Sequence, residues 1–252
     1  MRLDQYLVEN NYFETRSKAK AAIDEGHVYI NDKKCTKASF DIKGDEKIEL
    51  KDVCPYVSRG GYKLLGAIQN FNLDFKDKIV LDIGSSTGGF TDCSIQNGAK
   101  LVYAVDVGTN QLHDSLRNNP KVISMENTNI LDLDINILNP RPNILVMDVS
   151  FVSIEYLLPG INNFILDDTI FVSLIKPQFE VGNIKIKNGI VKDRVTHIKI
   201  IENVRLELNK YGLDIFKLTP SPILGGSGNK EFLALIKRGI NPDLNIIKSI
   251  EE

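Results

Sequence analysis

The sequence predicts an α/β protein in which a Rossmann-like, mostly parallel sheet of seven strands ends on an antiparallel strand and follows a small α+β domain. Apolar runs of strand length recur from about residue 60 onward. The first five alternate with helical patterns, which is typical of a parallel sheet with helices on both faces. The last two are joined by the turn-rich segment Pro220–Gly228, which favours an antiparallel hairpin. The seven runs are Ile79–Ile83, Leu101–Asp106, Val122–Met125, Ile144–Val149, Ile170–Ile175, Leu213–Leu218 and Phe232–Lys237.

Composition excludes several protein classes. The chain has 252 residues, 42% hydrophobic and 25% charged, which matches a globular protein with a core and excludes a mostly disordered chain. No apolar run of about 18 residues is present, and the N-terminus lacks the apolar segment of a signal peptide. The three cysteines show no close spacing, which argues against a disulfide framework and a cysteine zinc site. We therefore expect a cytoplasmic protein with no metal.

Residues 1–50 are expected to form the small domain. Leu3, Tyr6 and Leu7 have the spacing of a short amphipathic helix, and Thr15 is placed to cap a second helix, Arg16–Glu25. Two short strands are expected after it, His27–Ile30 and Lys47–Leu50. Residues 51–59 contain a proline and no periodicity, so they are the expected linker, and residues 60–240 the large domain. In the large domain, a long amphipathic helix is expected after Asp193.

A glycine-rich turn follows the first strand of the large sheet and opens a helix. Its spacing, G-x-x-x-G-G from Gly84 to Gly89, differs from that of dinucleotide-binding and phosphate-cradling loops. Asp82, just before the turn, suits a ligand with positive charge, such as the amino group or sulfonium of S-adenosylmethionine. It can also order the loop backbone, and the two roles are compatible. Asp106, which ends the next strand, can accept both ribose hydroxyls of an adenosine. The loop resembles the first motif of Rossmann-like methyltransferases, and the alternative is a tight turn without a ligand.

The expected cofactor is therefore S-adenosylmethionine. Asn129, in the turn after the third strand, is the expected adenine contact, with Asp132 as a weaker competitor; turns rich in asparagine also form for local reasons. The expected cofactor-binding residues are Asp82, Gly84, Ser85, Ser86, Gly88, Gly89, Phe90, Asp106, Val107 and Asn129.

Four ionisable residues at the ends of expected elements form the candidate catalytic centre. Asp148 ends the fourth strand, Lys176 ends the fifth before a proline, and Glu231 begins the last. Lys63 follows a Ser-Arg-Gly-Gly-Tyr run. Ligands bind at the carboxyl ends of strands in open α/β sheets. A lone charge at such a place is commonly solvated, but four together predict a catalytic site.

These four residues resemble the Lys-Asp-Lys-Glu tetrad of the ribose 2′-O-methyltransferases related to the heat-shock methyltransferase of large-subunit rRNA. Residues 1–50 resemble an S4 RNA-binding domain, with Arg2-Leu3-Asp4 at the start and Thr15–Ala19 at the second helix. Together they resemble the TlyA family, also called hemolysins, from Met1 to about Arg238. The resemblance implies 2′-O-methylation of cytidine in ribosomal RNA with S-adenosylmethionine. It also implies the shorter type that acts on the large subunit, because the chain starts directly at the S4 motif.

The chemistry gives Lys176 the role of base. A ribose 2′-hydroxyl is a poor nucleophile at neutral pH, so a positioned group must take its proton as it attacks the methyl group. A lysine can do this only in its neutral form, which Lys63 and the sulfonium favour. Asp148 and Glu231 are expected to orient Lys176 and to hold Lys63. In-line placement of oxygen, carbon and sulfur contributes as well.

Basic residues of the small domain are the candidate RNA contacts, although the net charge of −2 is not that of a typical nucleic-acid binder. Residues 1–60 hold eleven Lys/Arg and eleven Asp/Glu, so a solvated surface of mixed charge is the alternative. Arg59 is placed to guide the RNA backbone, and Phe151 either stacks on the target base or packs in the core. The expected RNA-binding residues are Arg2, Arg16, Ser17, Lys18, Lys20, Lys33, Lys34 and Arg59, with Lys37 as a further cation.

Other functions fit the sequence less well. A nucleobase N-methyltransferase usually carries prolines after the fourth strand, where this chain has Asp-Val-Ser-Phe. The loop spacing disfavours a nicotinamide oxidoreductase. A membrane-active hemolysin would need membrane-active segments, and none is visible. A non-catalytic RNA-binding assembly factor leaves Lys176 and Glu231 without a purpose. The expected partner is ribosomal RNA or a ribosomal subunit, with no membrane, and the chain is either a monomer or a homodimer.

Overall fold

A computed structural model describes residues 1–51, 53–182, 189–226 and 228–251. The expected linker position Asp52 and the hairpin position Ser227 lie outside these ranges. The chain divides into two compact units, Met1–Pro55 and Tyr56–Glu252. The division places Tyr56 to Arg59, four residues of the expected linker, in the second unit.

The first unit packs two helices on a three-stranded antiparallel sheet. The helices are α1 (Leu3–Glu9) and α2 (Arg16–Asp24), and the strands are β1 (Val28–Ile30), β2 (Lys33–Lys34) and β3 (Ile48–Leu50) in the order β2-β1-β3. Thr15 caps α2 as predicted, because its hydroxyl accepts a hydrogen bond from the Lys18 N–H at 3.2 Å. The core contains the small and apolar residues of the helices and of β1: Leu3, Leu7, Ala19, Ala22, Ile23, Val28, Ile30 and Ile42.

The second unit is built on a seven-stranded sheet, so the predicted fold class is confirmed. Its order is β6-β5-β4-β7-β8-β10-β9, and β10 runs antiparallel to both of its neighbours while the other pairs are parallel. The strands are β4 (Ile79–Ile83), β5 (Leu101–Val105), β6 (Val122–Met125), β7 (Ile144–Met147), β8 (Ile170–Ile175), β9 (Leu213–Pro220) and β10 (Phe232–Arg238). Strand order reverses between β4 and β7, which is where open α/β sheets bind ligands.

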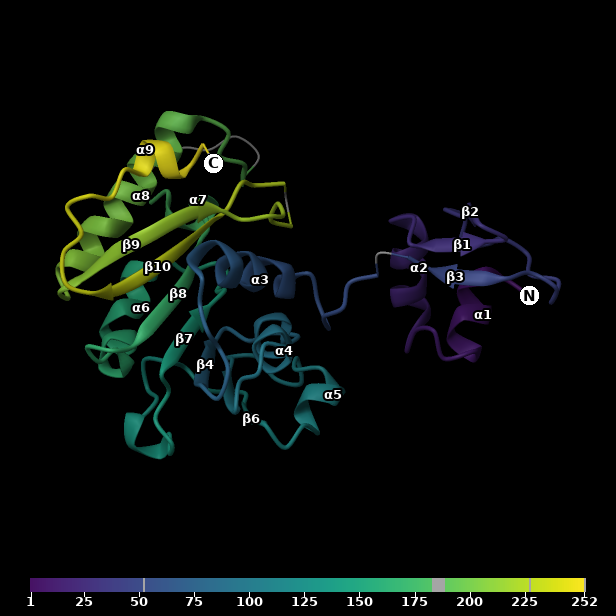
Figure 1. Ribbon diagram of the computed structural model, residues 1–252, viewed down its shortest axis with the longest axis horizontal. Coiled ribbons are helices and arrows are strands. Elements are labelled where there is room, and N and C mark those ends of the chain that lie inside the picture. The colour runs from purple at the N-terminus through teal and green to yellow at the C-terminus, as the bar shows by residue number, and fades with distance from the viewer. Residues whose placement is uncertain (52, 183–188, 227, 252) are drawn as a thin grey trace. The chain divides into compact units, whose positions relative to one another are not determined.

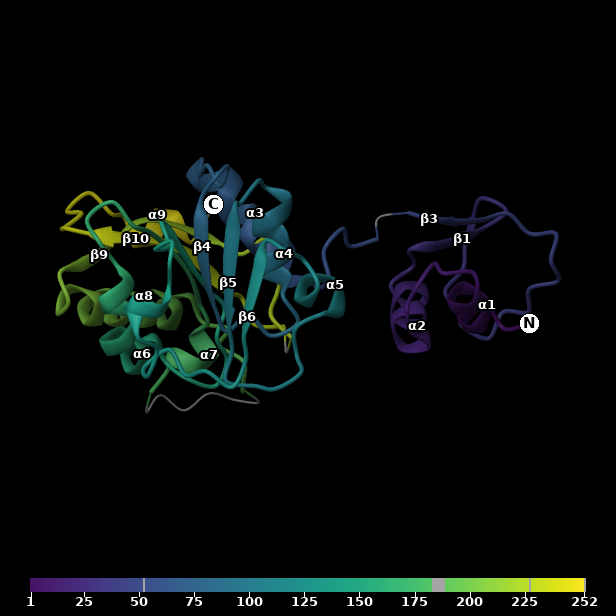
Figure 2. The same ribbon diagram turned by 90° about the horizontal axis from the view of Figure 1, so that it is seen from below.

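Helices cover both faces of this sheet (Figures 1 and 2). On one face, α3 (Gly60–Phe71) and α4 (Gly89–Gln96) bury residues such as Leu64 and Phe90. On the other, α6 (Ile154–Ile161), α8 (Arg194–Asn209) and α9 (Ile246–Ser249) bury residues such as Ile201. Two further helices, α5 (Asp114–Arg117) and α7 (Pro177–Glu180), are one turn long. No helix in the described part of the chain is long and apolar enough to span a bilayer.

The predicted alternation of strand and helix fails at one connection, and two strands are shorter than predicted. Between β6 and β7 the chain forms only a 3-10 turn, Ile135–Ile137, because this stretch is rich in Asn, Asp and Pro. β5 ends at Val105, since the carboxylate of Asp106 turns back to accept the N–H groups of Ser86 and Gly108. β7 ends at Met147, which leaves Asp148 beyond the ladder and in the cleft.

Candidate active site

A cavity of about 340 Å³ lies at the carboxyl ends of β4, β7 and β8, a size within the range of small-molecule sites. Three segments that are distant in sequence surround it: the glycine turn after β4, the start of α3, and the connection between β9 and β10. Its lining residues are Ser58, Arg59, Gly60, Lys63, Gly84, Ser85, Ser86, Thr87, Gly89, Phe90, Asp148, Ser150, Lys176, Ile223, Leu224 and Gly226. A ligand there would contact the loop and the ionisable residues at once.

The structure brings all four ionisable residues together. Lys63 Nζ donates to Glu231 Oε2 at 2.7 Å and lies 3.6 Å from Asp148 Oδ2. Lys176 Nζ lies 2.5 Å from the other oxygen of the same carboxylate, Asp148 Oδ1. Both amines therefore flank Asp148. Lys63, Lys176 and Glu231 are only 9%, 7% and 2% exposed, so this cluster is shielded from water, and its charges interact strongly.

Two further polar residues, which sequence reasoning missed, hold the cluster. Ser150 Oγ accepts a hydrogen bond from Lys176 Nζ at 2.8 Å, and Gln178 Nε2 donates to Glu231 Oε1 at 3.0 Å. Each lies two residues beyond a member of the cluster, Ser150 in the loop after β7 and Gln178 in α7. Their closeness in sequence to Asp148 and Lys176 is the only feature of the sequence that could have indicated a role in the site. Glu231 was expected to contact both lysines, and it forms its ion pair with Lys63. Lys176 contacts Asp148 and Ser150 instead.

The glycine turn is packed tightly on the protein and presents one unpaired hydroxyl to the cavity. Gly84 and Gly88 have φ of +77° and +100°, in the left-handed region that glycine adopts without strain. Ser85 is buried and lines the cavity, and its hydroxyl has no hydrogen-bond partner in the described structure. A buried hydroxyl without a partner is costly. The turn therefore fits a polar ligand such as the expected cofactor.

The two acidic residues near the turn act on the protein itself. Asp82 is fully buried, accepts a hydrogen bond from the Thr91 hydroxyl at 2.6 Å, and does not line the cavity. Burial raises the pKa of Asp82 to about 7, against the Thr91 hydrogen bond, which lowers it. Asp106 is engaged by backbone N–H groups of Ser86 and Gly108. One oxygen of Asp82 thus holds the start of α4, and the other, Oδ1, has no hydrogen-bond partner in the described structure.

The expected adenine contacts lie outside the cavity that holds the lysines. Asn129 is partly buried, and its side-chain oxygen accepts the Leu131 N–H at 3.1 Å. This is a local turn interaction, the alternative to an adenine contact that the sequence also allowed. Val107 is 70% exposed, and Asp132 is exposed. None of the three lines this cavity.

The start of the second unit contributes to the site more than its sequence indicated. Ser58 and Gly60, like Arg59, line the cavity. The backbone packs closely here: a side chain at Gly89 would lie 2.3 Å from Ser58 Oγ and 3.0 Å from the Gly61 N. The aperiodic sequence of residues 51–59 concealed this role, because such close packing has no signature in hydrophobic periodicity.

Phe151 is not a core residue, so that alternative is wrong. It is 89% exposed, and its φ of +66° is a strained value for an aromatic side chain. Its ring packs at 4.9 Å, centroid to centroid, on Phe179, whose ring lies 5.9 Å from Lys176 Nζ. Strain of this kind persists where the surrounding structure holds a residue in place, and here it leaves a large apolar face in solvent beside the lysine.

Glu180 connects the turns that carry the site. Its carboxylate Oε1 accepts the Ile154 N–H at 3.0 Å, so it caps α6 from α7. Burial raises the pKa of Glu180 to about 7, against the Ile154 hydrogen bond, and Glu155 raises it further. Sequence reasoning missed this residue, because nothing local marks it as buried.

Glu180→Gln is expected to be more stable than the wild type above pH 8. A raised carboxyl pKa gives stability that is present at acid pH and lost as the pH rises through about 7, and Gln keeps the hydrogen-bond acceptor without ionising. The gain is at most about 3 kcal/mol at pH 8.5 and vanishes near pH 4.5. Urea unfolding across this range measures it, with the exposed Glu202→Gln as the matched control. The same pH dependence in both variants would refute the assignment.

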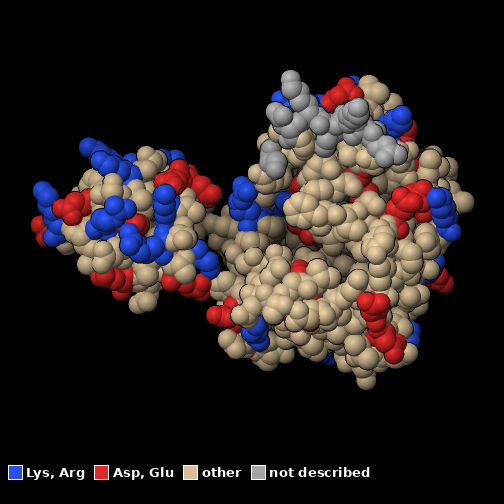
Figure 3. All heavy atoms as spheres, turned by 180° about the vertical axis from the view of Figure 1, so that it is seen from behind, with Lys and Arg blue, Asp and Glu red and all other residues tan. Residues whose placement is uncertain are grey.

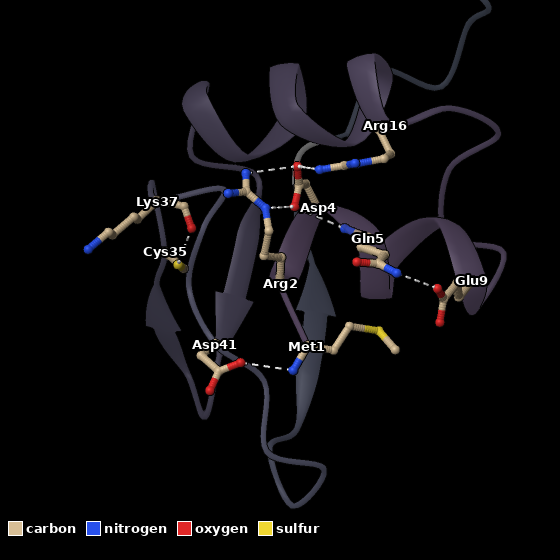
Figure 4. A network of polar contacts seen from close by, with 9 residues as sticks. All are labelled: Met1, Arg2, Asp4, Gln5, Glu9, Arg16, Cys35, Lys37 and Asp41. Atoms are coloured by element: carbon tan, nitrogen blue, oxygen red, sulfur yellow. Dashed lines mark hydrogen bonds and ion pairs between the residues drawn. The ribbon is translucent and has the colours of Figure 1, made fainter.

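In the first unit, a buried carboxylate organises two of the expected RNA contacts (Figure 4). Asp4 accepts from Arg2 Nε at 2.9 Å and from an Arg16 guanidinium nitrogen at 2.8 Å. The Arg2 hydrogen bond, with Arg16, holds the pKa of Asp4 well below its usual range against the cost of burial. Both guanidinium groups stay half exposed, so Asp4 fixes them at the surface while neutralising part of their charge.

The other expected RNA contacts lie at the surface of the first unit. Lys18, in the first turn of α2, pairs at 2.6 Å with Glu14, which lies just before the helix. Basic side chains gather across the face of this unit that Figure 3 shows, with acidic ones toward its edges. The basic and acidic side chains of this unit are therefore not evenly mixed over its surface. The remaining exposed residues of the set are Ser17, Lys20, Lys33, Lys34 and Lys37.

Comparisons with known proteins agree with this arrangement. The family model of FtsJ-like methyltransferases matches residues 56–238, and that of the S4 domain matches residues 1–48. A Campylobacter jejuni relative named 23S rRNA (cytidine-2′-O)-methyltransferase TlyA is 37% identical over 92% of this chain and 97% of its own length. A Mycobacterium tuberculosis relative named 16S/23S rRNA (cytidine-2′-O)-methyltransferase TlyA is 33% identical over 94% and 89%. The chain belongs to the TlyA family.

A solved structure of the TlyA family's fold matches along the whole chain. The protein, from Streptococcus thermophilus and named as a hemolysin, is 42% identical, with a TM-score of 0.77 over 100% of this chain and 93% of that one. The predicted family and the predicted methyltransferase class are thereby confirmed. The methyltransferase match starts at Tyr56, so Ser58 and Arg59 belong to the matched domain.

Proposed function

We propose that this TlyA-family protein transfers a methyl group from S-adenosylmethionine to the ribose 2′-hydroxyl of a cytidine in ribosomal RNA, with 23S rRNA as the expected substrate. The observation that carries the proposal is the pair of buried amines, Lys63 and Lys176, that flank one carboxylate beside the glycine turn. The names of both TlyA relatives support cytidine in ribosomal RNA as the substrate, and the name of the Campylobacter jejuni relative alone supports 23S rRNA.

S-adenosylmethionine, when bound, supplies an activated methyl group on a positively charged sulfur. The residues that would hold it are those of the glycine turn that line the cavity, with Ser85 offering the hydroxyl that has no partner in the described structure. Phe90 adds an apolar wall from the start of α4. Lys63, Asp148 and Lys176 line the same cavity, so they face whatever the turn binds.

Lys176 acts as the base that takes the proton of the 2′-hydroxyl. Its amine is held by Asp148 and Ser150 within the cavity, which fixes its direction before substrate arrives. Lys63 lies beside the same carboxylate, 3.6 Å from Asp148 Oδ2. Glu231 keeps Lys63 in this position.

The remaining expected contacts position the RNA. The S4 domain presents Arg2 and Arg16, fixed by Asp4, for phosphate binding, together with the exposed lysines of the same unit. Arg59 lines the cavity and is exposed, so it contacts the backbone next to the target nucleotide. A ribosomal substrate places the protein in the cytoplasm.

Phe151→Ala is expected to raise the KM for RNA about 10- to 100-fold, because base stacking on an aromatic ring contributes about 1–3 kcal/mol. The affinity for S-adenosylmethionine should not change, since Phe151 does not line the cofactor cavity. Tyr156→Ala, which removes another exposed aromatic ring from the same segment, is the matched control. An unchanged KM in Phe151→Ala would contradict stacking.

Labelled methyl transfer tests the proposed function. Isolated 23S and 16S rRNA, and the two ribosomal subunits, are incubated with S-adenosylmethionine carrying a labelled methyl group, and the RNA is digested to nucleosides. We expect label in 2′-O-methylcytidine from 23S rRNA or the large subunit. Label in a methylated base would overturn the ribose assignment, and label in 16S rRNA alone would overturn the choice of subunit. Absence of label in every RNA would favour a non-catalytic assembly factor.

A further inference from the structure

A second cavity, the basic pocket, lies on the other side of the connection between β9 and β10. Its volume is about 600 Å³. The start of α8, the segment before it and the residues after α9 surround it, and Figure 1 draws α8 and α9 as neighbours. The residues that matter here are Lys192, Arg194, His197, Leu224, Lys230 and Glu251.

Positive charge dominates the lining of the basic pocket. Arg194 forms an ion pair with Glu251, the one carboxylate among the lining residues that the structure describes. In the described part of the chain, no carboxylate pairs with Lys192 or Lys230. Lys230 Nζ donates to the Ile250 carbonyl at 2.8 Å, which positions the amine without neutralising it. Two ammonium groups therefore face one cavity without counter-ions, an arrangement that attracts an anion.

His197 adds a buried polar group to the same wall. The residue is only 5% exposed, and its ring nitrogen Nε2 has no hydrogen-bond partner among the described residues. The ring packs edge-on against Phe232 at 5.3 Å, and Lys230 Nζ lies 5.6 Å from the centre of that Phe232 ring. A buried nitrogen without a partner costs free energy unless a ligand satisfies it. Because the other ring nitrogen bonds the Val191 backbone, Nε2 of the neutral ring is an acceptor, so His197 shapes the wall of the basic pocket and does not itself bind an anion.

The basic pocket adjoins the candidate active site. Leu224 lines both cavities, so only the connection between β9 and β10 separates them. Lys230 is also the neighbour in sequence of Glu231, which belongs to the catalytic cluster. A polymer that places one sugar at Lys176 can therefore extend over Leu224 toward the basic pocket.

We propose that the basic pocket binds a backbone phosphate of the substrate RNA strand, close to the nucleotide that is methylated. The inference rests on the proposed function and deepens it, because it assigns an RNA contact within the methyltransferase unit in addition to those of the S4 domain. Lys192 and Lys230 neutralise the phosphate, and the ring of His197 forms part of the wall beside it. Such contacts set the register of the strand and thereby select which ribose reaches Lys176.

Binding measurements at several salt concentrations test the proposal. The probe is a fluorescent 23S rRNA fragment that contains the methylated cytidine, titrated with wild type, the double variant Lys192→Gln/Lys230→Gln and the control Lys237→Gln on β10, outside the pocket. For the double variant we expect a Kd about tenfold higher at 100 mM KCl and a slope of log K against log[salt] lower by about 1 to 2. Its affinity for S-adenosylmethionine and its kcat at saturating RNA should match those of the control.

The outcomes separate this inference from the proposed function. A Kd and a salt slope equal to those of Lys237→Gln would overturn the phosphate site. An unchanged Kd with a reduced kcat would overturn it too, because it would place the effect on Glu231. Loss of inorganic phosphate binding alone, with RNA binding intact, would assign the pocket to a free anion. Weaker RNA binding in the double variant would support the pocket even if the wild type transferred no methyl group, which would be a failure of the proposed function alone.

Discussion

Replacing Lys176 with alanine is expected to lower the single-turnover rate of methyl transfer to rRNA by about 10²- to 10⁴-fold, the usual contribution of a positioned base. The amine lies 2.5 Å from Asp148 and donates to Ser150, and no other amine in the described cavity has this pair of partners. S-adenosylmethionine binding, measured by calorimetry, should persist, because the glycine turn is unchanged. The RNA Kd should also persist.

The control for Lys176→Ala is Lys100→Ala. Lys100 is exposed and lies just before β5, at the amino-terminal ends of the parallel strands and so at the end of the sheet opposite to the active site. Its rate should equal that of the wild type. Thermal unfolding of both variants checks that the loss of rate does not come from unfolding. A Lys176→Ala enzyme that retained more than a tenth of the wild-type rate would contradict the role of Lys176 as base.

Asp148→Asn is expected to cause the second largest loss, about 10²-fold in the single-turnover rate, with little change in the Kd for RNA. The carboxylate separates two buried amines, which would repel each other across a neutral amide. Asn keeps the volume of Asp, so a loss of rate reports charge and orientation and not a cavity. Asp148→Asn should also lower the thermal stability, since it leaves one carboxylate, Glu231, for the two amines.

The exposed variant Asp167→Asn is the control for Asp148→Asn. It removes one carboxylate in the same unit and should change neither rate nor stability by a measurable amount. An Asp148→Asn enzyme with full activity would show that Asp148 does not position Lys176.

Local sequence signals located the seven strands of the large sheet and the four ionisable residues, but not β2 of the first unit, which is a two-residue strand of exposed lysines. Lys176 could be located because an apolar strand ends abruptly in Lys-Pro, and Asp148 because it follows a buried run. Parallel strands bring their carboxyl ends to one edge, so the two residues had to lie close together. Glu231 comes from a distant part of the chain, and its pairing with Lys63 was expected from the chemistry of a lysine base and not from a local pattern.

What the sequence concealed depends on tertiary packing. The partners of Asp82 and Asn129 are protein groups, and nothing in their motifs distinguishes that from a ligand contact. Glu180 is polar and lies on a one-turn helix, and the packing of α7 on α8 and the hydrogen bond to the start of α6 shield it in part from water. Phe151 was left between core and surface, because a positive φ in a non-glycine residue has no sequence signature.

The most direct test of the central claim changes the substrate atom and leaves the protein intact. Wild-type enzyme is given two otherwise identical rRNA fragments, one with ribocytidine and one with 2′-deoxycytidine at the methylated position. If Lys176 takes a proton from the 2′-oxygen, the ribose fragment is methylated, and the deoxy fragment binds with similar Kd but accepts no methyl group. Equal methylation of both fragments would place the methyl group on the base and contradict the account.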